Sequence, residues 1–147
     1  MTLNEARTRS QQIDPQLQSA DWKLNDRTQV RLEVPVDGYD AEPWNGVTDY
    51  CLYDASGSVL AVVEAKREDI IGGLGQCAAA MVAIREFNAR DRTTTKAVFG
   101  CVTSGSNWRF LRLAEGCLSI DRPEYYLHDV GKVIAIVVHI IGTGVRA

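Results

Sequence analysis

The four cysteines of this 147-residue chain form no metal-binding pattern. Cys51, Cys77, Cys101 and Cys117 occur singly, without the C-x-x-C or Cys/His spacing that zinc sites require. Three of the four lie within apolar segments, and such thiols are usually buried. The pattern therefore favours free thiols in a reducing cytoplasm over a disulfide framework.

The chain also lacks a long apolar run and a large excess of either charge. Its most apolar stretch, residues 133–141 (VIAIVVHII), is far shorter than the roughly 20 residues of a membrane-spanning helix and contains His139. The opening MTLNEARTRS has no apolar signal core. The formal net charge is −3, so a nucleic-acid site would need a local basic patch or a bound cation. We expect a cytoplasmic protein without a membrane partner.

The rest of the composition is typical of a soluble globular domain, with 46% apolar and 24% charged residues. We find no repeat, linker or low-complexity tract, so residues 1–147 are expected to form a single domain. A domain of this size buries roughly 70% of its unfolded surface, which is enough for a substantial core.

Hydrophobic periodicity predicts an alternation of helices and strands. A helix is expected over residues 3–13, followed by a restart with Asp14 as N-cap and Pro15 at the first helical position. The other expected elements are strands at 30–36, 48–54, 58–66, 96–105 and 107–113, and helices at 76–88 and 123–141. The last segment is dense in β-branched residues, so a strand is the alternative there. Pro35 favours a sheet edge for its strand, and Gly142 would end the last helix. This order predicts an α/β (α+β) fold with helices packed on a mixed sheet.

Two of these strands, 48–54 and 58–66, are separated by a Ser-Gly tip that is typical of a β-hairpin. A tip centred there predicts the pairs Tyr53–Leu60, Cys51–Val62 and Asp49–Glu64. Paired residues share a face of the sheet, and Lys66 lies two residues beyond Glu64 on that same face. A three-residue loop or a β-bulge would shift this register by one residue.

Asp49, Glu64 and Lys66 together have the chemistry that phosphodiester hydrolysis needs. Two carboxylates held this close repel, and one takes up a proton unless a cation lies between them. Mg²⁺ suits the position because it binds through one or two carboxylates, waters and a phosphate. A neighbouring lysine can orient or deprotonate the attacking water, or neutralise charge growing on a phosphate. By itself, however, the E-x-K spacing favours a plain solvated strand end.

Several blocks of the sequence carry a family resemblance. They are NEARTRSQQIDPQLQSADW (4–22), VRLEVPV (30–36), TDYCLYDASGSVLAVVEAKR (48–67) and TSGSNWRFLRL (103–113). In this order they resemble the PD-(D/E)XK nuclease superfamily, and they are most similar to the N-terminal nuclease domain of the restriction (R) subunit of type I restriction-modification enzymes. The resemblance covers about residues 4–113 and reverses the preference for a plain strand end.

The resemblance implies a PD-(D/E)XK restriction-endonuclease-like core that binds Mg²⁺ or Mn²⁺. Asp49, Glu64 and the carbonyl of Ala65 would be metal ligands, and Lys66 would be the catalytic lysine. Two further residues match the family: Glu5, which would support a second metal ion or its waters, and Gln76, which matches the glutamine of a Q-x-x-x-Y motif. Both have plainer explanations, because a first-turn glutamate favours the helix dipole and the tyrosine position of the motif is Ala80 here.

The family's subunit continues into a helicase motor, whereas this sequence has no G-x-x-x-x-G-K-S/T motif. We therefore expect a Mg²⁺-dependent DNA endonuclease that acts as a homo-oligomer or with a restriction-modification partner subunit. The alternative is a catalytically silent module of the same fold that binds DNA or a protein.

Two other patterns have competing explanations. The segment GGLGQCA (72–78) contains the G-x-G-x-x-A of dinucleotide-binding sites, but KREDII separates it from the strand and no convincing βαβ unit is expected. A flexible loop before a helix is the preferred explanation. A loose basic cluster, comprising Arg85, Arg90, Arg92 and Lys96, is either solvated surface or a flank that contacts phosphates.

Overall fold

The computed structural model describes residues 3–37, 45–66, 69–90 and 95–145. Its strands form a seven-stranded sheet in the order β1-β2-β3-β4-β5-β6, with the short β7 paired to β5. The strands are β1 (Val30–Asp37), β2 (Asn45–Tyr53), β3 (Val59–Ala65), β4 (Val98–Thr103), β5 (Asn107–Ala114), β6 (Cys117–Ile120) and β7 (Tyr125–Tyr126). Only β3 and β4 pair in parallel among the described strands. The predicted α/β class with a mixed sheet is confirmed, and β1 lies at the edge as Pro35 predicts.

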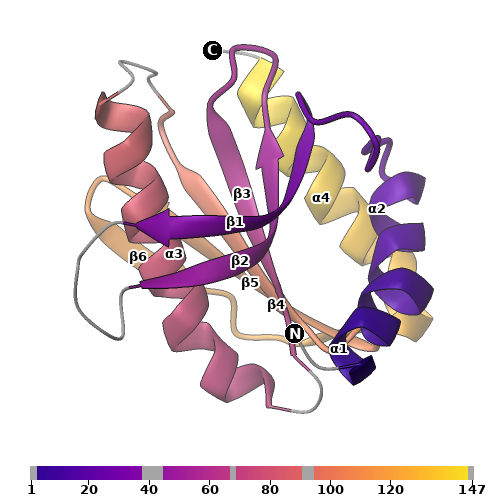
Figure 1. Cartoon of the computed structure of the whole chain (residues 1–147). Helices are drawn as coiled ribbons and strands as arrows, with labels where there is room; N and C mark the ends of the chain where they lie inside the picture. The colour runs from indigo at the N-terminus through magenta and orange to yellow at the C-terminus, as the bar shows by residue number, and fades with distance from the viewer. Residues whose placement is uncertain (1–2, 38–44, 67–68, 91–94, 146–147) are drawn as a thin grey trace.

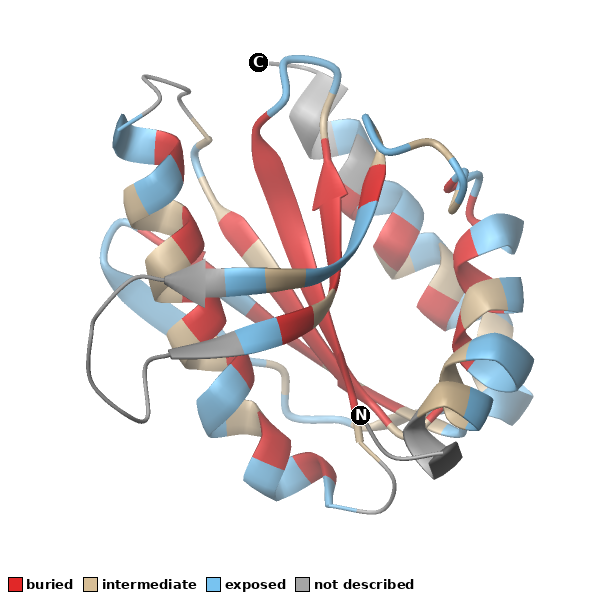
Figure 2. Ribbon diagram, in the orientation of Figure 1, coloured by how far each residue is buried: buried red, intermediate tan, exposed pale blue. Residues whose placement is uncertain are grey.

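Helices cover both faces of this sheet (Figure 1). The long α3 (Ile70–Arg90) packs on one face, whereas α1 (Leu3–Thr8), α2 (Asp14–Ser19) and α4 (Val130–Val145) lie on the other. Each face has its own apolar cluster, and β3 is buried along its whole length between the two (Figure 2). A charged residue on β3 is therefore removed from water wherever it points.

The glycine-rich segment is helical, which corrects the prediction of a flexible loop. Helix α3 begins at Ile70, six residues before the predicted start at Gln76, and the Asp69 side chain caps it by accepting a hydrogen bond from the Gly72 N–H at 2.7 Å. The helix joins the parallel strands β3 and β4, so a βαβ unit exists where none was expected. Its glycines lie inside the helix, and a dinucleotide fingerprint would need them at the strand end.

The N-terminal helix continues through Asp14, and the predicted N-cap there is wrong. Residues Arg9–Ile13 form a π-helical turn, in which the Asp14 N–H donates to the Arg9 carbonyl. Asp14 has helical dihedral angles, and its side chain instead accepts a hydrogen bond from the Tyr50 hydroxyl at 2.8 Å. The wider turn ends two residues before Pro15, which has no N–H to give to an ordinary α-helical ladder.

The C-terminal elements differ from the prediction at their ends. The short β6 and β7 were not predicted, and the last helix begins at Val130 and continues past Gly142 to Val145. Among the α4 side chains that the structure describes, the buried ones are Val133, Val137 and Ile140. Among the described residues, α3 is the only helix long and apolar enough to cross a membrane, but its apolar side packs on the sheet.

Candidate functional site

The hairpin of β2 and β3 brings Asp49 to the end of β3. Cys51 pairs with Val62, as the sequence predicts, and the Oδ2 atom of Asp49 accepts a hydrogen bond from the Ala65 N–H at 2.8 Å. The register shifts between Leu52 and Tyr53, so Tyr53 lies opposite Val59 and the predicted Tyr53–Leu60 pair is wrong. The bulge lies at the tip and leaves the polar end of the hairpin in the predicted register.

Glu64 is the most deeply buried acidic residue of this site, with only 1% of its surface exposed. Its Oε2 atom accepts a hydrogen bond from the Gln76 amide at 3.3 Å, whereas Oε1 is buried without a hydrogen-bond partner among the described residues. Burial, and secondarily the charge of Asp49, raises the pKa of Glu64 to about 8, against the opposing effect of Lys66. The site therefore holds an acidic group that a positive charge would stabilise.

Lys66 and Gln76 complete the polar group. The Nζ atom of Lys66 donates to the Gln76 Oε1 at 2.5 Å, so the amide links the amine to the carboxylate of Glu64. Gly73 makes the close approach of helix and lysine feasible, because a Cβ atom there would lie 2.9 Å from the Lys66 Cγ and 2.7 Å from the Val102 Cγ1. The structure thus brings together four of the predicted residues, Asp49, Glu64, Lys66 and Gln76.

Arg9 also belongs to this site, although it was not predicted from the sequence. Its guanidinium lies 3.8 Å from the Asp49 Oδ1, 3.3 Å from the Glu33 Oε1 and 5.6 Å from the centre of the Tyr50 ring. Glu33, its partner on β1, has a positive φ of 52°, a conformation that costs a non-glycine residue energy. The sequence feature that could have identified Arg9 is the Thr8-Arg9 pair of the block 4–22, because Arg9 lies one helical turn after Glu5.

The remaining predicted site residues are only partly tested. Glu5 lies in α1, but its side chain is outside the described part of the chain, so its role stays a prediction. Ala65 is buried, and its N–H orients Asp49; the use of its carbonyl as a metal ligand also stays a prediction. Within the described ranges, no group of three or more His, Cys, Asp or Glu side chains is placed to hold a metal ion.

The donor set nevertheless fits a hard divalent cation. Glu64 offers an oxygen without a partner among the described residues, and Asp49 places a second carboxylate close enough to raise the pKa of Glu64. Mg²⁺ commonly binds through one or two carboxylates and completes its shell with water or a phosphate. Two carboxylates and a nearby lysine could therefore bind such an ion and stabilise an anionic substrate.

No family model, curated protein or solved structure matches this chain. The function must therefore be inferred from the site.

Proposed function

We propose that the chain is a Mg²⁺-dependent DNA endonuclease of the PD-(D/E)XK kind, without a helicase motor. The observation that carries the proposal is the buried carboxylate of Glu64. One of its oxygens has no hydrogen-bond partner in the described part of the chain, Asp49 lies beside it, and Gln76 links it to Lys66. A buried acid in such surroundings is costly, and proteins retain this arrangement mostly at functional sites.

Each side chain has a distinct part in the proposed reaction. Asp49, Glu64 and the carbonyl of Ala65 would hold Mg²⁺ or Mn²⁺, which supplies Lewis acidity toward the phosphate and the attacking water. Lys66 would stabilise the charge that grows on the phosphate, and Gln76 would hold the lysine amine toward that charge. Arg9 would hold Asp49 in place between the N-terminal helix and the strand.

DNA and a second protein are the proposed partners. With a net charge of −3, the chain has little general attraction for DNA, so a homo-oligomer or a restriction-modification partner subunit would supply the additional contacts. Sedimentation and plasmid cleavage at physiological salt test the need for a second protein. Efficient cleavage of DNA by the monomer alone would contradict it.

The catalytically silent module remains the second candidate because the polar group is already linked internally. Asp49 accepts a hydrogen bond from Ala65 and lies near Arg9, and Lys66 is bonded to Gln76. Such a network could be a purely structural end of the hairpin. Binding of DNA or protein without turnover would then be the function of the fold.

Paired measurements on two variants separate the candidates. Glu64→Gln should weaken Mg²⁺ binding in calorimetry, because a hard cation prefers carboxylate oxygen, but should leave DNA binding intact. Lys66→Ala should keep or tighten Mg²⁺ binding while plasmid nicking falls by about 10²–10³-fold. Glu115→Gln and Lys23→Ala are matched controls, since both residues are exposed and distant in sequence from the site.

Two results would overturn the endonuclease. If wild-type protein neither binds Mg²⁺ nor nicks supercoiled plasmid, even with its cellular partner restored, the silent module is favoured. If it nicks DNA and both variants nick equally well, Glu64 and Lys66 form only the polar end of a strand.

A further inference from the structure

Strand β6 is an open edge of the sheet. The Asp121 N–H donates to the Phe110 carbonyl at 2.9 Å, in the register that pairs β6 with β5. Because backbone groups alternate in direction along an antiparallel strand, Ser119 bonds to β5, whereas the N–H and carbonyl groups of Leu118 and Ile120 point away from it. Within the described ranges, no backbone group bonds to these outward groups. The edge can therefore accept one more strand.

The side chains of β6 are also uncovered. All four of its residues are exposed, and Leu118 and Ile120 leave 40% and 43% of their surface accessible. They lie opposite Leu113 and Leu111 of β5, which belong to the apolar cluster under α3, so both point to the α3 face of the sheet. The strand carries no charge. It thus presents a small apolar patch beside unpaired backbone groups.

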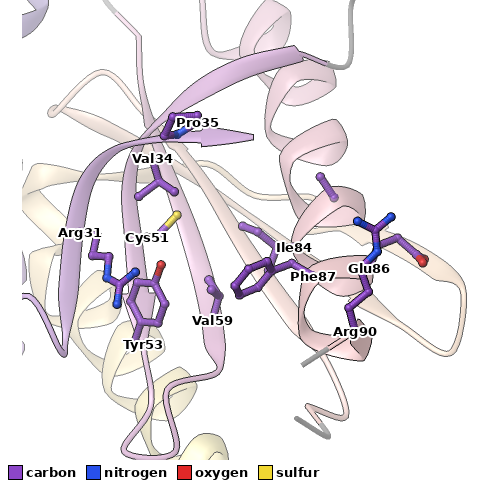
Figure 3. A pocket seen from close by; sticks show the side chains of 11 residues that line it. Arg31, Val34, Pro35, Cys51, Tyr53, Val59, Ile84, Glu86, Phe87 and Arg90 are labelled. Carbon is purple, nitrogen blue, oxygen red and sulfur yellow. The ribbon is translucent and has the colours of Figure 1, made fainter. Parts of the chain in front are cut away.

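The opposite edge of the sheet, β1, is protected against a further strand. Pro35 has no N–H to donate, and Glu33 departs from extended backbone with a φ of 52°. Arg31 and Asp37 add charges to the same strand. Figure 3 shows Arg31 and Pro35 on β1, where they also line a cavity of about 320 Å³ against α3. Of the devices that protect sheet edges, β6 has only its shortness.

The pattern of β6 is symmetric about Ser119, with one apolar residue on each side. A two-fold axis at Ser119 would place Leu118 of each copy opposite Ile120 of the other, and all four side chains would share the α3 face. The outward backbone groups of these residues would then bond to each other. Pairing of β6 with β1 of another copy would instead leave a free edge at each end and continue as a fibre, which the protected β1 opposes.

We propose that β6 pairs antiparallel with β6 of a second copy, about a two-fold axis at Ser119, so that one continuous sheet crosses a homodimer. The inference does not depend on the nuclease chemistry, because the interface shares no residue with the Asp49–Glu64–Lys66–Gln76 group. It gives a location to the homo-oligomer proposed above. Two four-residue strands bury less than the roughly 1,200–2,000 Å² of stable interfaces, so the dimer should dissociate on dilution.

Sedimentation velocity of the full chain between about 1 and 200 µM tests the association. Wild-type protein should shift from monomer to dimer as the concentration rises. Ile120→Lys should weaken the dimer by about tenfold or more, because each copy would place a charge opposite Leu118 of the other. Leu32→Lys adds the same charge to an exposed apolar residue of β1 and is the matched control, which should associate like wild type. Circular dichroism confirms that each variant is folded.

A cross-link tests the register. At the axis, the two copies of Ser119 form a non-hydrogen-bonded pair with Cα atoms about 4.5 Å apart, which a disulfide can span. Ser119→Cys in a Cys117→Ser background should therefore form a disulfide-linked dimer under mild oxidation, since the other three cysteines are buried. Ser56→Cys in the same background, at the exposed tip of the β2–β3 hairpin, is the control. Wild-type Cys117 should not cross-link, because its two copies would lie roughly 13 Å apart.

The proposal is overturned by any of three results. Wild-type protein stays monomeric at about 200 µM, Ile120→Lys and Leu32→Lys associate equally, or the cysteine at position 119 cross-links no better than the one at position 56. The cross-link decides the case if Ile120→Lys does not fold. None of these measurements uses DNA cleavage, so failure of the proposed endonuclease would not affect them.

Discussion

The two ends of α3 are fastened to the same strand by side-chain amides, but through different partners. Near the start of the helix, Gln76 bonds to the carboxylate of Glu64 and to the amine of Lys66. Near its end, Asn88 accepts a hydrogen bond from the Val59 N–H at 3.1 Å and donates one to the Val59 carbonyl at 2.9 Å. The Asn88 amide also donates to the Thr95 hydroxyl at 3.1 Å. One amide thus bonds to a carboxylate and an amine, and the other to backbone groups and a hydroxyl.

The two ends of α3 therefore differ in how firmly their side-chain hydrogen bonds are fixed. Backbone groups do not titrate, and Asn88 is buried with 2% of its surface exposed, so its contacts are fixed once the chain folds. Gln76 is exposed, and one of its partners is Glu64, whose pKa of about 8 places its change of charge within the working pH range. We infer that the Asn88 end sets the position of α3, whereas the Gln76 end can exchange partners without unfolding the protein.

The largest expected effect is a pH dependence that arises at Glu64. Its pKa of about 8 in the folded state, against 4.5 as the ordinary value, means that the folded state keeps a proton that the unfolded state has lost. The free energy of unfolding should therefore fall by about 4 kcal/mol between pH 4.5 and pH 8, and then level off. Urea unfolding with EDTA should show this fall for wild type and not for Glu64→Gln. Identical pH dependence in the two proteins would contradict it.

Asn88→Ala tests the fixed end and should cost about 3 kcal/mol of unfolding free energy. The substitution leaves the buried N–H and carbonyl of Val59 without their side-chain partner. Gln76→Ala should cost less than about 1 kcal/mol, because water can reach the exposed position. Both values come from urea unfolding at one pH. Equal losses would remove the distinction between the two ends.

A pair of glycine substitutions tests how closely the helix approaches Lys66. Gly73→Ala should destabilise the fold by about 2 kcal/mol, because the new Cβ would meet the buried Val102 as well as the Lys66 side chain. Gly75→Ala should stabilise the helix by about 0.5–1 kcal/mol, because a Cβ atom at that position would meet no heavy atom within 4 Å. Thermal unfolding measures both, and the same sign for the two changes would refute the close contact.

The smallest effect concerns Arg9. Arg9→Gln removes a positive charge 3.8 Å from the Asp49 Oδ1, so Mg²⁺ affinity in calorimetry should rise by about fivefold. Arg7→Gln, an exposed arginine two residues earlier, should leave that affinity unchanged. Weaker Mg²⁺ binding by Arg9→Gln would show that the arginine chiefly orients Asp49 and does not compete with the cation.

The sequence predicted the hairpin and its polar end because the information there is local. A short Ser-Gly tip and strict alternation place Asp49, Glu64 and Lys66 on one face, and the bulge at Tyr53 lies beyond them. Arg9 could not be placed in this way, because its contacts with Glu33 and Asp49 depend on how a helix packs on the sheet.

Local sequence propensity also failed to predict the start of α3 and the strands β6 and β7, because tertiary packing determines these elements. Glycines disfavour helices, yet the Asp69 cap and the packing of α3 on the sheet keep this segment helical. Gly73 leaves the space that Lys66 and Val102 occupy beside the helix. The strands β6 and β7, with four and two residues, are too short to show a period of their own. Their pairing with β5 defines them.

Because Arg9–Ile13 form a π-helical turn, one tyrosine, Tyr50, contacts residues at both ends of that turn. Arg9 lies over the Tyr50 ring and Asp14 accepts the Tyr50 hydroxyl hydrogen bond, although the two residues are five positions apart. In an α-helix, residues five apart point about 140° away from each other, whereas the wider turn brings them back toward the same side. Deletion of a single residue in the turn would rotate everything before it by about 100°. Tyr50 could then keep its hydrogen bond to Asp14 or its ring contact with Arg9, but not both. The number of residues in this turn is therefore constrained, as well as their identity.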